Sequence, residues 1–149
     1  MSGLKIVRTT RNRVADVAPL FHAYRRYYQQ RSDEASCRGF LLERVDKAES
    51  VIFLALVNGK VVGFAQLYPS FSSVWMKRLW ILNDLFVVPK ARRHRVGTAL
   101  LDASRQLAKK TGAKGLILET KKDNLRAQRL YEKLGWTRDE MFYHYYLEA

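Results

Sequence analysis

The sequence predicts a mixed α/β fold (an α+β mixed sheet) in the order β α α β β β α β α β. Three observations lead to this prediction. Asn58-Gly59 lies between two apolar runs, which is a strong signal of a β-hairpin. The stretch 83–101 is typical of a buried strand, a proline stop and a helix start. A further strand and helix then follow, which favours a β–α–β crossover added to a mainly antiparallel sheet flanked by helices.

The N-terminal third predicts one strand and two helices. Leu4–Thr10 alternates weakly between apolar and polar residues, as a first strand does. Residues 13–29 keep helical spacing, and Pro19 lies near the first turns of that helix, where proline is tolerated. Residues 32–49 form a second helical region, which carries five of the fourteen acidic residues. A solvated helix face explains these acids most simply, and attraction of a cationic substrate is the alternative.

The middle of the chain predicts an antiparallel meander of three strands. Its first two strands are Val51–Val57 and Lys60–Tyr68, and Pro69–Ser73 is expected to be a turn or loop. Val74–Val88 is the third strand. Pro89 ends it, because proline cannot extend a central strand.

The C-terminal half alternates helix and strand. We expect a helix from Gly97-Thr98 to about Lys110, a strand at Gly115–Thr120, a helix at Asn124–Leu134 and a final strand at Met141–Leu147. No linker or repeat interrupts the chain, so residues 1–149 are expected to form a single domain.

The composition favours an anionic partner. The chain of 149 residues has 27 lysines and arginines against 14 acids, a net charge of +13. Nucleotides, phosphorylated cofactors and nucleic acid all suit that charge, but its spread along the chain is more typical of a solvated surface than of a nucleic-acid track. The one cysteine and three scattered histidines give no metal-ligand spacing, so no metal is expected. Without a membrane-length apolar run or a secretory signal, we expect a cytoplasmic protein with no membrane partner.

A basic junction at 90–98 is the first candidate site. Cations crowd the loop, and Gly97 and Thr98 then open a helix. Free N–H groups at a helix start, its positive dipole end and several cations suit a pyrophosphate. An ordinary strand–loop–helix junction with a solvated basic loop is the alternative.

A second pattern lies in the helix at 124–134. Asn124, Ala127 and Tyr131 are spaced i, i+3 and i+7, which places them on one stripe of the helix. Taken alone, Tyr131 is more typical of a packing tyrosine.

Together the two patterns resemble the GNAT superfamily of acetyl-CoA-dependent N-acetyltransferases. The family's first motif is Arg/Gln-x-x-Gly-x-Gly/Ala after a strand and a proline, and here it is Arg92-Arg93-His94-Arg95-Val96-Gly97. The second is Asn-x-x-Ala-x-x-Leu-Tyr-Glu-x-x-Gly-Phe/Trp, which is matched from Asn124 to Trp136. Arg95 stands where the family has its first glycine. The closest resemblance is to small diamine and polyamine acetyltransferases and to yeast histone/polyamine acetyltransferases.

The resemblance implies a GNAT-like fold and a role for each matching position. The pantetheine arm of acetyl-CoA would pair with the strand that carries Leu85, Phe86 and Val87. Asn124 and Ala127 would lie along that arm, and Tyr131 would protonate or hydrogen-bond the departing thiolate. The pyrophosphate would be held by the loop and helix start: Arg92, Arg93, His94, Arg95, Val96, Gly97 and Thr98.

The general base is less directly implied. The polyamine enzymes have Glu-Asp where this chain has Asn83-Asp84, and Asn83 cannot take a proton. Three interpretations stay open: Asp84 acts through water, no protein base is needed, or Asp84 is a buried carboxylate bonded to the backbone.

The acceptor is expected beside the aromatic end of the first helix. Tyr24, Tyr27, Tyr28 and Glu34 would suit an amine cation, either a polyamine, an amino-acid-like amine or a protein lysine. Family members often dimerise through C-terminal strands, which implies a homodimer here. Two other functions remain as alternatives: a basic nucleic-acid-binding module and a coenzyme-A-binding protein without catalysis.

Overall fold

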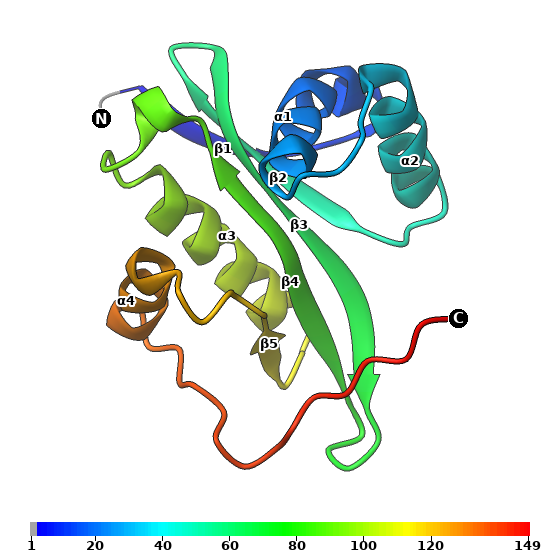
Figure 1. The fold of residues 1–149 in the computed structure, drawn as a ribbon, viewed down its shortest axis with the longest axis vertical. Coiled ribbons are helices and arrows are strands. Elements are labelled where there is room, and N and C mark those ends of the chain that lie inside the picture. Colours follow the sequence, from blue (N-terminus) through cyan, green and yellow to red (C-terminus); the bar gives the residue numbers. More distant parts are fainter. Residues whose placement is uncertain (1–2) are drawn as a thin grey trace. The chain divides into compact units, whose positions relative to one another are not determined.

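The computed structural model describes residues 3–149. The chain divides into two compact units, one ending at Leu118 and the other spanning Glu119–Ala149. The first unit holds a five-stranded sheet in the order β1-β2-β3-β4-β5 (Figure 1). The second unit holds one helix. The single domain expected over residues 1–149 stays a prediction.

The helices and strands follow the predicted order up to the last element. The strands are β1 Leu4–Arg8, β2 Val51–Val57, β3 Lys60–Ser72, β4 Lys77–Val87 and β5 Gly115–Ile117. The α-helices are α1 Val14–Tyr27, α2 Glu34–Asp46, α3 Val96–Lys110 and α4 Leu125–Lys133, and short 3-10 turns lie at Arg11–Arg13 and Pro89–Ala91.

The sheet is antiparallel from β1 to β4, and β5 joins β4 in parallel after the α3 crossover. At the β2–β3 hairpin, Asn58 and Gly59 both have positive φ, 51° and 80°. Two positive φ angles are the signature of a type I′ turn, so the predicted hairpin is confirmed with its expected turn chemistry.

Helices cover both faces of this sheet (Figure 1). On one face, α1 and α2 bury Phe21 and Leu41 in a core cluster with Phe64 of β3. On the other face, α3 lies close to Gly63, where a Cβ would be 3.3 Å from a methyl of Val96 and 3.4 Å from a methyl of Leu100. The same Cβ would lie 2.9 Å from the carbonyl oxygen of Phe86 on the neighbouring strand β4. Glycine at position 63 therefore sets how near α3 lies to β3.

The loop expected at Pro69–Ser73 is wrong for most of its length, because β3 runs on to Ser72 and pairs with β4 to the end. The β2 ladder stops at Leu67. Pro69 therefore lies where β3 pairs on one side only, the edge environment in which a strand tolerates proline.

The final strand predicted at Met141–Leu147 is also wrong, since these residues adopt no regular structure. A strand needs a neighbouring strand with free backbone groups. Within residues 119–149, α4 is the only regular element. This unit therefore contains no strand with which residues 141–147 could pair, although their apolar residues alternate as in a strand.

Candidate active site

A β-bulge in β4 orients the candidate base. Gln66 of β3 lies opposite Asp84, but the next residue of β3, Leu67, lies opposite Leu82. Asn83 is therefore an extra residue in β4. A bulge re-aims side chains, and this one places Asp84 on the same face of the sheet as Gln66.

Asp84 is buried, with 4% of its surface exposed. Its Oδ2 accepts a hydrogen bond from Gln66 Nε2 at 2.6 Å, and its Oδ1 accepts one from Asn83 Nδ2 at 3.1 Å. Burial raises the pKa of Asp84 above its ordinary value, and hydrogen bonds from Gln66, Asn83 and Tyr24 oppose that shift. Asp84 is therefore buried, as one of the three interpretations expects, but its partners are side chains and not the backbone that this interpretation names.

Three predicted acceptor-site tyrosines form one aromatic cluster at the end of α1. The rings of Tyr24 and Tyr28 lie 5.1 Å apart, and those of Tyr27 and Tyr28 lie 5.2 Å apart. The Tyr24 hydroxyl donates to the carbonyl oxygen of Asn83 at 3.4 Å, which ties this cluster to the bulge. Burial, followed by the nearby Asp84, raises the pKa of Tyr24 well above its usual range. Tyr24 therefore keeps its proton at neutral pH and acts as a donor.

Glu34, the fourth predicted acceptor-site residue, is not joined to this cluster. It lies exposed in the first turn of α2, and no hydrogen bond, ion pair or ring contact of Glu34 is present within residues 3–149. The helix is capped by its neighbour Asp33, which accepts from the Ser36 N–H at 2.8 Å.

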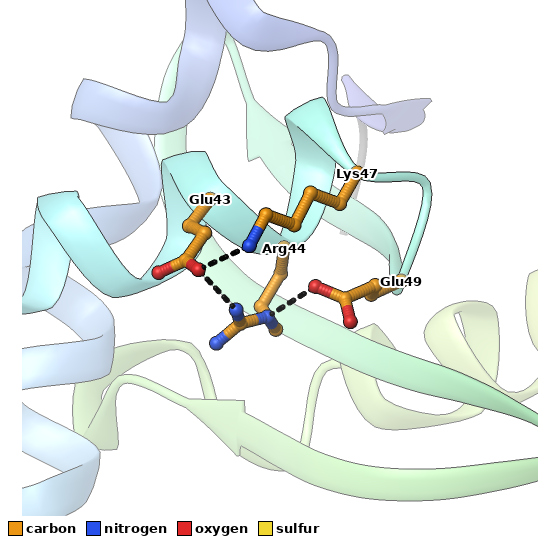
Figure 2. Close-up of polar contacts among 4 residues, drawn as sticks. All are labelled: Glu43, Arg44, Lys47 and Glu49. Atoms are coloured by element: carbon orange, nitrogen blue, oxygen red, sulfur yellow. Dashed lines mark hydrogen bonds and ion pairs between the residues drawn. The ribbon is translucent and has the colours of Figure 1, made fainter.

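The other acids of the 32–49 segment pair with cations of the same chain. Figure 2 shows Arg44 between Glu43 and Glu49, at N–O distances of 3.2 and 3.1 Å, with Lys47 bonded to Glu43 at 2.7 Å. Asp46 pairs with Arg11. Apart from Glu34, the acids of this segment are therefore engaged within the fold, as a solvated helix face predicts.

One edge of β4 is open along the predicted cofactor strand. The ladder with β5 covers only Leu79–Ile81, and among residues 3–149 no strand pairs with that edge along Leu85, Phe86 and Val87. Unpaired N–H and C=O groups on a strand edge are a template for an extended ligand. This edge is therefore open to pairing along Leu85, Phe86 and Val87, and the role expected for these residues towards the pantetheine arm stays a prediction.

The basic loop leads from that strand into α3. Arg92 lies at its start, where Nε donates to the carbonyl oxygen of Val87 at 2.9 Å. The first hydrogen bond of α3 runs from the Ala99 N–H to the carbonyl of Arg95, so the N–H groups of Val96, Gly97 and Thr98 precede it. Arg93, His94 and Arg95 are exposed around this helix start.

Arg95, at the position of the family's first glycine, adopts a backbone conformation that favours glycine. It is the N-cap residue of α3, with φ 64° and ψ 14°, in the left-handed region. Arg93 also has a positive φ, 67°. This region disfavours residues with a side chain, so Arg95 holds a conformation that glycine would adopt at lower cost.

In the second unit, Asn124 caps α4. Its side-chain oxygen accepts from the Ala127 N–H at 3.2 Å, which confirms that Asn124 begins this helix. The rings of Tyr131 and Trp136 lie 5.9 Å apart, and Gly135, with φ 96°, ends the helix. The roles expected for Asn124, Ala127 and Tyr131 towards the cofactor stay predictions.

Two site residues were missed by the sequence analysis. Gln66 is buried against Asp84, and the pKa of Tyr68 is raised by burial and by the nearby Asp84. Gln66 is the only polar side chain between Val61 and Leu67. An amide within an apolar strand is unusual, and this feature of the sequence could have identified it.

Metal binding and membrane insertion are two further properties on which the described residues bear. No group of three or more His, Cys, Asp or Glu side chains is placed to hold a metal ion. Over the same residues, no helix has the length and apolar character needed to cross a bilayer.

Comparison with known proteins identifies the family. Residues 16–136 match the acetyltransferase (GNAT) family. YhfO of Bacillus subtilis, an uncharacterized N-acetyltransferase, is 50% identical over 135 residues, or 91% of each chain. An N-alpha-acetyltransferase of Sulfurisphaera tokodaii is 32% identical over 117 residues, 74% of this chain and 70% of the relative. The crystal structure of a probable acetyltransferase is 43% identical, with a TM-score of 0.92 over 97% of both chains. The chain therefore belongs to the GNAT family and is an acetyl-CoA-dependent N-acetyltransferase.

Proposed function

We propose that this enzyme moves the acetyl group of acetyl-CoA to the α-amine of an amino-acid-like compound or a peptide, by direct attack in a ternary complex. One observation carries the proposal. A single strand, β4, holds a buried carboxylate at its bulge, an open edge beyond it and a basic helix start after its end.

The residues at the end of β4 and the start of α3 fit the cofactor. The backbone of Leu85, Phe86 and Val87 would hydrogen-bond the pantetheine arm. The N–H groups of Val96, Gly97 and Thr98 would bind the pyrophosphate, with the cations of the loop beside them. When bound, acetyl-CoA supplies an acetyl group already activated as a thioester.

Asp84 and Tyr131 are assigned the two proton steps. Asp84 would take a proton from the acceptor ammonium, and a backbone N–H of β4 would stabilise charge that develops on the carbonyl oxygen. Tyr131 would hydrogen-bond the departing thiolate. Full proton transfer from a phenol of pKa about 10 to a thiolate of about 8.5 is uphill by roughly 2 kcal/mol, so a hydrogen bond can suffice.

The cost of deprotonation favours an α-amine over a lysine-like amine. At pH 7, a neutral amine of pKa about 10.4 costs about 4.6 kcal/mol, whereas an α-amine of pKa about 7.8 costs about 1 kcal/mol. Asp84, the single carboxylate buried at the bulge, is a weak base. An α-amine is therefore the acceptor that this base serves best, and one relative reported above is named an N-alpha-acetyltransferase.

The unpaired charges of residues 25–38 disfavour a polycation. Among the contacts of the described residues, Glu34 is the one acid of the 32–49 segment without a partner. Within residues 3–149, Arg25, Arg26, Arg31 and Arg38 form no ion pair with an acid. Residues 25–38 hold these four arginines against two acids, so a polyamine would meet net positive charge there, while an amine that carries a carboxylate nearby would be attracted.

The test is release of the coenzyme A thiol with a panel of amines. It includes an unblocked peptide, the same peptide with a blocked N-terminus and a free lysine, a diamine, spermidine and an aminoglycoside. We expect kcat/KM at pH 7.5 to be at least tenfold higher for the unblocked peptide than for the blocked one. A higher kcat/KM for spermidine or the blocked peptide would overturn the acceptor class.

The net charge of +13 favours one rival activity, nucleic-acid binding. This activity predicts DNA affinity that falls steeply with salt, with a slope reflecting several phosphates. A coenzyme-A-binding protein without catalysis is the third candidate, and it predicts affinity for acetyl-CoA with no thiol release for any amine in the panel.

The proposal extends to a homodimer through the C-terminal segment. The large side chains of this segment are 71–94% exposed: Met141, Phe142, Tyr143, Tyr145, Tyr146 and Leu147. Apolar exposure of this extent is typical of an interaction surface. Sedimentation at micromolar concentration should give a dimer, and a monomer would count against it.

A further inference from the structure

A buried amide–carboxylate pair joins β3 to β4. Gln66 is fully buried and Asp84 nearly so, and the two residues lie opposite each other in the ladder. The distance from Gln66 Nε2 to Asp84 Oδ2 is 2.6 Å. One amide N–H therefore fixes one carboxylate oxygen.

The other end of the Gln66 amide has no partner in the fold. Its Oε1 is buried, and no donor among residues 3–149 reaches it. Buried amide oxygens are nearly always hydrogen-bonded, so this one points to a donor from outside the chain. A water molecule or the N–H of an acceptor would supply that donor, and either can carry the proton that an amine must lose.

The groups that face Asp84 are neutral. Tyr24 comes from α1, Gln66 and Tyr68 from β3, and Asn83 from β4 itself. Arg44 of α2 acts on Tyr68, and no ion pair of Asp84 is present in the described part of the chain. Hydrogen-bond donors therefore oppose the effect of burial on the pKa of Asp84, and Gln66 makes the largest contribution among them.

We infer that Gln66 is a positioning residue for amine deprotonation: it holds Asp84 Oδ2 in place and offers Oε1 to the group that carries the proton. This inference rests on the proposed acetyl transfer. An N–H bond of the acceptor ammonium breaks, an O–H bond forms on Asp84, and the electron pair stays on nitrogen. That nitrogen then bonds to the acetyl carbon, the C–S bond breaks, and the thiolate receives the second proton lost by nitrogen.

The test is the pH dependence of kcat/KM for Gln66→Met and Gln66→Glu. At low pH, kcat/KM falls as Asp84 becomes protonated, and this fall is the acid limb of the profile. Methionine keeps the length of the side chain but removes the hydrogen-bond donor, so the pKa of Asp84 rises. The acid limb therefore moves about one pH unit upward. For Gln66→Met, kcat/KM falls about tenfold at pH values where Asp84 is mostly protonated, and less than about twofold at pH 9. Glutamate adds a carboxyl that shares a proton with Asp84, so its limb moves upward as well.

Two controls separate positioning from packing. Ser104 is equally buried, on α3, where its hydroxyl donates to the Leu100 carbonyl, so Ser104→Ala should leave the acid limb in place. In an Asp84→Asn background, Gln66→Met should change kcat/KM by less than about twofold, because the partner through which it acts is gone.

An unshifted acid limb in folded Gln66→Met or Gln66→Glu would overturn the inference, as would an equal loss at every pH. Circular dichroism checks the folding of each variant, and the glutamate variant decides the matter if the methionine variant does not fold. A wild-type enzyme that acetylates no amine would reject the proposed function instead. If the wild type is active but the Gln66 variants have the same acid limb as the wild type, only the role of Gln66 is rejected.

Discussion

Arg95→Gly should make the protein more stable. Arg95 holds φ 64° and ψ 14° at the start of α3. A residue with a side chain pays about 1–2 kcal/mol for this conformation, while glycine adopts it freely. Glycine also has more conformational freedom in the unfolded chain, which lowers the stabilisation by about 0.4–1 kcal/mol. The net gain is therefore about 0.8 kcal/mol at the middle of these ranges, or a rise in Tm of about 2–3 °C for a chain of this length.

Differential scanning calorimetry with two control variants tests this reasoning. Arg95→Ala removes the charge but keeps a side chain in the left-handed region, so its Tm should not rise. Lys90→Gly places glycine in the same loop at a residue without a positive φ, and its Tm should fall. A Tm of Arg95→Gly that equals or falls below that of Arg95→Ala would refute backbone strain at position 95.

The same variants address the cofactor. Arg95 is exposed, so the loss of its charge should weaken coenzyme A binding by less than about fivefold in both Arg95→Gly and Arg95→Ala, as measured by isothermal titration calorimetry. Unchanged affinity would show that the side chain takes no part in binding. A large gain in affinity for glycine would mean that it obstructs the pyrophosphate.

Tyr131→Phe should lower kcat by about 100-fold or more with little change in coenzyme A affinity, and an unchanged kcat in steady-state kinetics would remove Tyr131 from the mechanism. Burial raises the pKa of Asp84 in the folded protein. Its contribution to the free energy of unfolding is therefore complete below a pH of about 4 and is lost as the pH rises through the folded-state pKa. Asp84→Asn should therefore have a higher Tm than wild type at pH 8, by a margin that narrows towards pH 4, and a lower Tm at pH 8 would contradict this sign. Gly63→Ala forces a Cβ to within 2.9 Å of a carbonyl oxygen and should cost about 2 kcal/mol, a fall in Tm of about 4–8 °C, whereas Gly39→Ala meets nothing within 4 Å and should not lower the Tm.

Local chemistry made much of the fold predictable. Asn58-Gly59 determines its own turn, because both residues accept positive φ. The start of α3 follows from a proline stop, a basic loop and an amphipathic helix in direct succession. Asn124 as the cap of α4 likewise depends on contacts within a few residues.

Features that depend on distant partners were not predictable. The bulge at Asn83 exists only in the register between two strands, and Gln66 meets Asp84 across that register. The segment 141–147 has the alternation of a strand but no strand partner in its unit, since periodicity indicates which residues suit a strand and not where a pairing edge lies. The motif position of Arg95 was visible in the sequence, but its left-handed backbone was not.

The most direct test of the account follows isotope-labelled acetyl from acetyl-CoA into a competing mixture of an unblocked peptide, its N-terminally blocked lysine form and spermidine. We expect most of the label on the peptide α-amine, and we expect the Asp84→Asn variant to transfer it at a rate at least about tenfold lower at pH 7.5. Label found mainly on spermidine, or transfer that is as fast without the Asp84 carboxylate, would contradict it.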